Sequence, residues 1–265
     1  MLSLFPDPCP PVTIRAMSAG SLPVRVRPAA IALGNDLPSV AELFAFMRDA
    51  ELRFETLRMT VEEHSATARG EEIVVSDVAL RHPGQARILV SRPSEKLKAD
   101  YEVWATDGKT IRTYVAERRL GTNRPVRGTV RGLANEDLPA TARTRPSRTP
   151  LQSESIPEVF LHPAGYTQNV LSTGRLSIAG LDAVAGREAI VVDCLTPRTA
   201  ELAADRPDFA IRIWVDRRDG VILRLQETLG GQVTRDAITT TYRPNAELRE
   251  SDLAFTFPPD TTFIY

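Results

Sequence analysis

The chain has 265 residues, enough for one large domain or two small ones with a substantial core. Its 33 lysines and arginines balance its 34 aspartates and glutamates, so no overall positive field favours nucleic acid or an anionic membrane as a partner. Two cysteines are too few for a disulfide framework or a cysteine-type zinc site. No segment has the roughly 18 continuous apolar residues of a transmembrane helix.

The first 36 residues are interrupted by prolines and arginines, which break every apolar run before the core of a signal peptide can form. We therefore predict a disordered leader over residues 1–36 and see no secretory signal in the sequence as written. Residues 37–265 are predicted to form a single domain.

The first ordered element is a predicted helix that begins after Ser39. Ser39 and Glu42 have the spacing of a capping box, and Pro38 stands just outside the helix. We expect this helix to end near Glu51. Apolar side chains recur at helical spacing and give it one face to bury: Val40, Leu43, Phe44 and Met47.

Alternation of apolar and polar residues then predicts strands in residues 54–64, 73–80, 86–91, 97–103 and 110–116. Short turns join them, such as the one at Asp107 and Gly108, and these are too short for crossover helices. The pattern is therefore typical of an antiparallel meander.

The regular pattern weakens in the middle of the chain. Residues 118–155 are rich in glycine, proline and arginine, which predicts a long flexible loop, either disordered or a functional flap. Residues 156–171 have weak helical periodicity, and Pro163 and Gly165 kink or divide that helix.

A second run of strands is predicted at residues 174–180, 188–195, 210–216, 221–226, 234–242 and 253–257. The clearest pair is the hairpin at residues 210–229, where Gly220 can close the short loop. Ile211 and Ile213 lie on one face of this hairpin. The two runs of strands have similar turns, which favours one continuous curved sheet.

Catalytic motifs are weak. Gly108-Lys109-Thr110 matches the end of a phosphate-binding loop, but strands surround it and its first glycine is missing. The three histidines lack ligand spacing, and no Gly-x-Ser-x-Gly elbow supplies a nucleophile. We therefore predict that the protein is not an enzyme and needs no cofactor or metal.

Several short motifs follow one another in a characteristic order: Arg92-Pro93, the strand at 97–104, Asp107-Gly108, Tyr114, the Trp-Val-Asp to Leu-Arg hairpin at 214–224, and Asp-Leu-x-Phe-x-Phe-Pro-Pro at 252–259. This order resembles the bacterial lipoprotein-carrier (LolA/LolB-like) superfamily. That superfamily includes outer-membrane lipoprotein carriers, actinobacterial lipoprotein relatives and the N-terminal domain of RseB/MucB regulators. The resemblance covers residues 37–265.

The resemblance implies an α+β, mainly β fold: an unclosed antiparallel β-barrel with helices capping its concave face. It also implies a noncatalytic extracytoplasmic carrier, in the periplasm or cell envelope, that holds a lipid or lipoprotein acyl chain in an apolar cavity. The alternative is an RseB-like regulator that binds an anti-sigma factor and senses lipid or mislocalised lipoprotein. A membrane acceptor protein is a further expected partner.

In such a fold the apolar faces of the helix and strands would line the cavity. The same pattern also fits an ordinary core filled by its own side chains. The candidate ligand-binding residues are Phe44, Met47, Leu57, Met59, Leu97, Tyr101, Ile111, Ile190, Val192, Ile211 and Ile213.

Overall fold

The structure is a computed structural model that describes residues 33–67, 70–93, 100–126, 149–198 and 208–264. The predicted leader lies almost wholly outside the described residues. So does most of the predicted loop at 118–155.

Within the described residues, twelve strands form one sheet, and four α-helices accompany it. The strands are β1 (Thr56–Thr67), β2 (Gly70–Arg81), β3 (Gln85–Ser91), β4 (Tyr101–Asp107), β5 (Thr110–Val115), β6 (Leu120–Pro125), β7 (Arg175–Val184), β8 (Arg187–Leu195), β9 (Phe209–Asp216), β10 (Ile222–Leu229), β11 (Gln232–Pro244) and β12 (Thr262–Phe263). The helices are α1 (Val40–Met47), α2 (Ile156–Leu161), α3 (Pro163–Asn169) and α4 (Glu250–Leu253), with short 3-10 turns η1 (Ala50–Leu52) and η4 (Leu171–Thr173).

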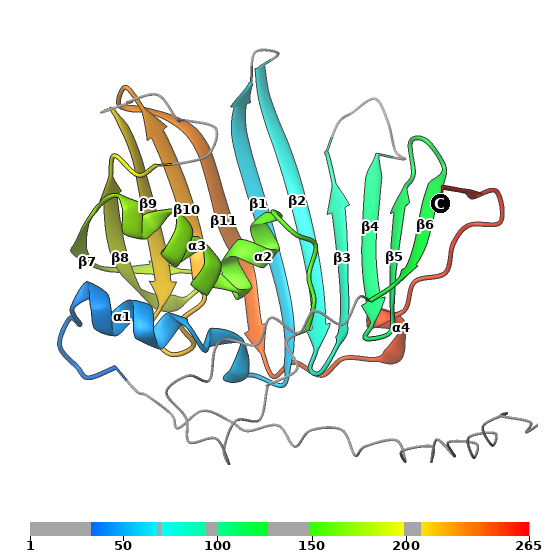
Figure 1. Cartoon of the computed structure of the whole chain (residues 1–265), viewed down its shortest axis with the longest axis horizontal. Helices are drawn as coiled ribbons and strands as arrows, with labels where there is room; N and C mark the ends of the chain where they lie inside the picture. Colours follow the sequence, from blue (N-terminus) through cyan, green and yellow to red (C-terminus); the bar gives the residue numbers. More distant parts are fainter. Residues whose placement is uncertain (1–32, 68–69, 94–99, 127–148, 199–207, 265) are drawn as a thin grey trace, which may run out of the picture.

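The strand order is β12-β6-β5-β4-β3-β2-β1-β11-β10-β9-β8-β7. Neighbouring strands are antiparallel except β12, which runs parallel to β6. Strand β1 pairs with both β2 and β11, so the two halves of the chain meet along it. The sheet bends, but its outer strands β7 and β12 do not pair with each other (Figure 1). The predicted fold class, an unclosed antiparallel barrel with helices on its concave face, is confirmed.

The N-terminal helix is capped as the sequence predicts. The Ser39 hydroxyl accepts the Glu42 N–H at 3.3 Å, and the Glu42 carboxylate accepts the Ser39 N–H at 2.8 Å. The α-helix ends at Met47, before the expected Glu51, which lies in η1. Helices α1, α2 and α3 lie across the concave side of the sheet (Figure 1).

Two elements differ from the expectation. Residues 120–125, placed in the predicted loop, form β6. The predicted strand at 253–257 is wrong: α4 occupies residues 250–253, and the chain then leaves regular structure. The alternating Phe255 and Phe257 do not pair with a neighbouring strand but pack on the convex face of the sheet, against Val103, Ala105 and Tyr114.

A buried ion cluster fixes the hairpin between β9 and β10. The Arg187 guanidinium donates to both oxygens of Asp216 at 2.7 and 2.8 Å, and to Asp219 at 2.6 Å. The Tyr242 hydroxyl also donates to Asp219, at 3.1 Å. Burial and the neighbouring Asp216 raise the pKa of Asp219. The cluster thereby ties β8, β9 and β11 together at one end of the sheet.

Gly220 brings α1 onto this hairpin. Its φ of +74° lies in the left-handed region that favours glycine, and a Cβ atom there would stand 3.0 Å from the Phe46 ring. The turn and the helix can therefore touch only because this position lacks a side chain.

We expect Asp216→Ala to lower the free energy of unfolding by roughly 3–5 kcal/mol, because it leaves the guanidinium of Arg187 short of a buried partner. Chemical denaturation measures the loss. The matched control is Asp193→Ala, which breaks the more exposed pair with Arg212 and should cost no more than about 1 kcal/mol. Equal losses in the two variants would contradict this role for the cluster.

The stability contributed by His64 should depend on pH. Its Nδ1 lies 2.8 Å from Glu71 and its Nε2 lies 2.6 Å from Glu62, and these hydrogen bonds raise its pKa above the ordinary 6.5. The stabilisation is therefore complete below the ordinary pKa and is lost as pH rises through the raised value. We expect the difference in melting temperature between wild type and His64→Gln to shrink as pH is raised from about 6 to about 9. A constant difference would show that the charged imidazole contributes nothing.

Candidate functional site

The concave face of the sheet carries most of the residues predicted to line a cavity. Seven candidates are at most 2% exposed and belong to one core cluster: Met47, Leu57, Met59, Ile190, Val192, Ile211 and Ile213. Phe44 and Ile111 are partly buried and pack against the same cluster. The candidates on the two halves of the chain thus meet on one surface.

Tyr101 is a correction, since it lies on the opposite face. It packs beside Val103 and Tyr114 in the second, convex cluster, with ring centroids of the two tyrosines 6.0 Å apart. Strand β4 has buried residues on both faces because Phe255 and Phe257 cover the convex side. The predicted alternation of Tyr101 and Val103 is present in β4, but these side chains lie on the convex face and not on the concave one. Leu97 lies outside the described residues.

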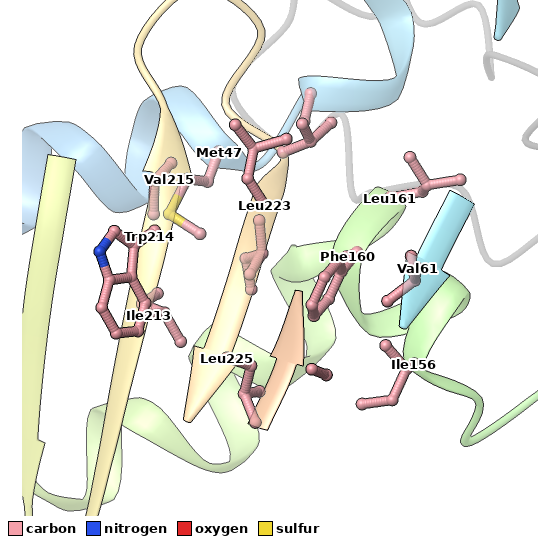
Figure 2. Close-up of a cluster of buried hydrophobic side chains, with 14 of the residues drawn as sticks. Met47, Val61, Ile156, Phe160, Leu161, Ile213, Trp214, Val215, Leu223 and Leu225 are labelled. Carbon is pink, nitrogen blue, oxygen red and sulfur yellow. The ribbon is translucent and has the colours of Figure 1, made fainter. Parts of the chain in front are cut away.

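Side chains of α2 fill the middle of the concave face. Ile156 is 6% exposed, and Phe160 and Leu161 are fully buried. Phe160 points in between Leu225 and Val61, which come from strands of the two halves of the chain (Figure 2). In this structure the concave face is therefore a packed core, and the residues that pack it come from a helix of six residues.

These α2 residues were not among the predicted site residues. The sequence does contain a signal for the helix, since Ser155 and Glu158 have the spacing of an N-terminal cap. In the structure the Ser155 hydroxyl accepts the Glu158 N–H at 3.3 Å. What the sequence could not show is that α2 packs into the middle of the bent sheet rather than along its rim.

A close buried contact lies at the junction of α2 and α3. His162 ends α2 and begins α3, and its Nε2 lies 2.5 Å from the Glu51 carboxylate in η1. The two side chains are only 3% and 6% exposed. Both side chains are polar and buried, and this contact places the junction against η1, the segment that follows α1.

Charged side chains lie on the concave face at the end remote from α1. The Arg235 guanidinium donates to Glu63 at 2.6 Å, and Glu227 lies 3.9 Å from it. Glu63 and Glu227 pull the pKa of Arg235 upward, against the opposing effect of burial. The apolar surface of the concave face is thus bounded by a polar group that spans β1, β10 and β11.

Two open recesses of about 400 and 430 Å³ are present. One runs along β4 to β6, where its lining residue Thr113 pairs with Trp104 and so lies on the concave face, and the other lies beside the β7–β8 turn. None of the candidate residues lines either recess. Within the described residues, no group of three or more His, Cys, Asp or Glu could hold a metal ion. No helix in that part of the chain is long and apolar enough to cross a membrane.

Fold and site together define an unclosed half-barrel whose apolar concave face is covered by short helices. No family model matches the chain, and no curated protein matches it. Solved structures do match it. The Pseudomonas aeruginosa MucA/MucB complex has 16% identity and a TM-score of 0.46, with 83% of this chain and 62% of that chain covered.

Two further matches cover nearly the whole of the other chain. An uncharacterised conserved protein from Thermus thermophilus has 13% identity and a TM-score of 0.46, covering 84% of this chain and 98% of that one. The lipoprotein LppX of Mycobacterium tuberculosis has 13% identity and a TM-score of 0.40, covering 80% and 99%. The predicted resemblance, which named MucB-type regulators and actinobacterial lipoproteins, agrees with these matches, and the likeness is one of fold.

The packing of α2 predicts the effect of truncating its central side chain. Phe160→Ala should lower the free energy of unfolding by roughly 3–5 kcal/mol, because a fully buried ring is replaced by a cavity. Phe257→Ala removes a half-buried ring on the convex face and should lower the free energy of unfolding by a smaller amount. Thermal or denaturant unfolding of the two variants measures the difference, and a neutral Phe160→Ala would contradict the close packing of α2.

Proposed function

We propose that the protein binds an acyl chain or a similar apolar segment along the concave face, in the space that α2 fills. The observation that carries this proposal is the nature of the covering layer. Ile156, Phe160 and Leu161 supply the buried surface, and they belong to a helix too short to be stable without these contacts. A ligand with comparable apolar surface can therefore take their place.

The energies permit the exchange. Full burial of three such side chains contributes roughly 4–9 kcal/mol. An acyl chain of about 16 carbons contributes roughly 12 kcal/mol if every methylene is buried. Ligand binding can therefore offset the release of α2, provided that the rest of the fold stays in place.

The contacts around α2 suggest how it would move. His162 holds the junction with α3 to Glu51, and the Cys194 thiol donates to the Leu171 carbonyl just after α3 at 3.3 Å. We propose that α3 stays docked and that α2 swings out about His162. Binding and release would then need no change in the sheet itself.

The resemblance in sequence motifs supports the wider setting of this proposal. We propose a noncatalytic protein of the periplasm or cell envelope whose ligand is a lipid or a lipoprotein acyl chain. A protein partner, either a membrane acceptor or an anti-sigma factor, would sense the position of α2.

The test uses the purified full-length chain. Organic extraction and mass spectrometry should show co-purified acyl species, and the delipidated protein should bind the apolar dye N-phenyl-1-naphthylamine saturably. Phe160→Ala should bind the dye more tightly because it weakens the competing helix, while Phe257→Ala on the other face should bind as wild type does. Absence of extracted acyl species, together with no saturable dye binding in any of the three proteins, would refute the proposal.

A further inference from the structure

A threonine hydroxyl is buried beneath the helices without a hydrogen-bond partner. Thr239 of β11 is 1% exposed, and its Oγ1 makes no hydrogen bond to the described part of the chain. Thr239 pairs with Val61 of β1, so the two side chains lie on the same face of the sheet. Val61 belongs to the concave core cluster and lies beside Phe160 of α2 (Figure 2). The Thr239 hydroxyl therefore lies on the concave face, near the part that α2 covers.

A β-bulge sets the face on which Thr239 lies. The register between β1 and β11 shifts between Thr60 and Val61, because β11 has an extra residue there, Thr240. Thr239 and Tyr242 are consequently both buried, although strict alternation would place residues three apart on opposite faces. Thr240 itself is exposed. The bulge thus turns one of two neighbouring threonines inward, to a position beside an apolar side chain.

Tyr166 of α3 has a second hydroxyl of this kind. Its oxygen is buried and has no hydrogen-bond partner within the described ranges, and its ring packs against the concave core cluster. Burial raises the pKa of Tyr166, so the hydroxyl keeps its proton and can donate it to an acceptor. Of the buried side-chain hydroxyls in the described residues, only those of Thr239 and Tyr166 lack a partner, and both lie on the concave side.

The chemistry of these two groups selects among apolar ligands. A buried hydroxyl that makes no hydrogen bond costs free energy, because it has lost its contact with water and gained no partner in exchange. A valine and a phenylalanine of similar shape would avoid this cost at the two positions. A plain hydrocarbon chain on the concave face would leave both hydroxyls unpaired. A chain that carries a hydroxyl or carbonyl oxygen could accept a hydrogen bond from either of them.

We propose that Thr239 and Tyr166 donate hydrogen bonds to neutral oxygen atoms within the apolar part of the ligand, and that this ligand is an acyl chain bearing hydroxyl or keto groups. This assignment rests on the proposed function, since the chain must first take the place of α2. With α2 swung out, Thr239 faces the chain from the sheet, and Tyr166 faces it from α3, which stays docked. Two side chains outside α2 thereby determine which chains bind best.

The test compares probes that share one chain length and one ionised end. Displacement of N-phenyl-1-naphthylamine from the delipidated full-length protein is measured with stearate and with stearates that carry a hydroxyl or a keto group at each of the mid-chain carbons in turn. We expect the best oxygenated probe to bind about fivefold more tightly than stearate, which is the worth of one neutral hydrogen bond. Equal or weaker binding of every oxygenated probe would refute the proposed role of the two hydroxyls.

The double variant Thr239→Val/Tyr166→Phe removes both hydroxyls with little change in shape. It should bind stearate as wild type does and lose the preference of about fivefold for the oxygenated probe. Its ligand-free form should keep its melting temperature or gain a little, since the lost hydroxyls had no partner in the described residues. The matched control is Thr240→Val/Tyr101→Phe, which changes an exposed threonine and a tyrosine of the convex face and should keep the preference.

The outcomes separate the role of the hydroxyls from the proposed function. If the dye does not bind and no probe is bound, the proposed function fails. If dye and stearate bind but the preference for oxygenated probes is absent, or survives in the double variant, the proposed function stands and the role of Thr239 and Tyr166 is refuted. Loss of the preference in the control variant as well would also refute that role.

Discussion

A bent sheet that does not close has one apolar concave face, and covering that face from water is the constraint on which the rest of this structure depends. A closed barrel would bury its interior by itself, whereas here separate helices must cover it. Helix α1 covers one end and is fixed there by the close approach of Phe46 to Gly220. Helix α2 covers the middle through Phe160 and Leu161. The stability of the sheet therefore depends on a layer that is not part of it.

Different forces hold the sheet together and hold the helices on its concave face. The sheet is held by the backbone hydrogen bonds between its strands and by the Arg187–Asp216 cluster. These contacts join β8, β9 and β11 to one another and do not depend on what lies on the concave face. Among the described contacts, α2 meets the sheet through apolar side chains, which are not specific to one partner. A contact of this kind can be exchanged for another apolar surface. In the proposed exchange, the contact between His162 and Glu51 stays in place while α2 moves.

Much of the fold could be predicted, because the alternation of apolar and polar residues and the choice of turn residues are local properties of the sequence. The β9–β10 hairpin shows alternation over its whole length, and the box at Ser39 sets the start of α1. The face of β4 could not be predicted, since apolar residues occur on both sides once Phe255 and Phe257 cover the convex one. That covering is a long-range contact that no local pattern contains.

Hydrogen exchange measured on the ligand-free protein and on the protein saturated with the apolar dye N-phenyl-1-naphthylamine tests the central claim most directly. The amides of Val159 and His162 are bonded within α2, to Ser155 and Glu158, and the Val170 amide is bonded within α3. We expect the ligand to remove protection from the α2 amides while Val170 and the strands β9 and β10 stay as protected as before. Undiminished protection of α2 in the saturated protein, or loss of protection across the sheet, would contradict the exchange of this helix for a ligand.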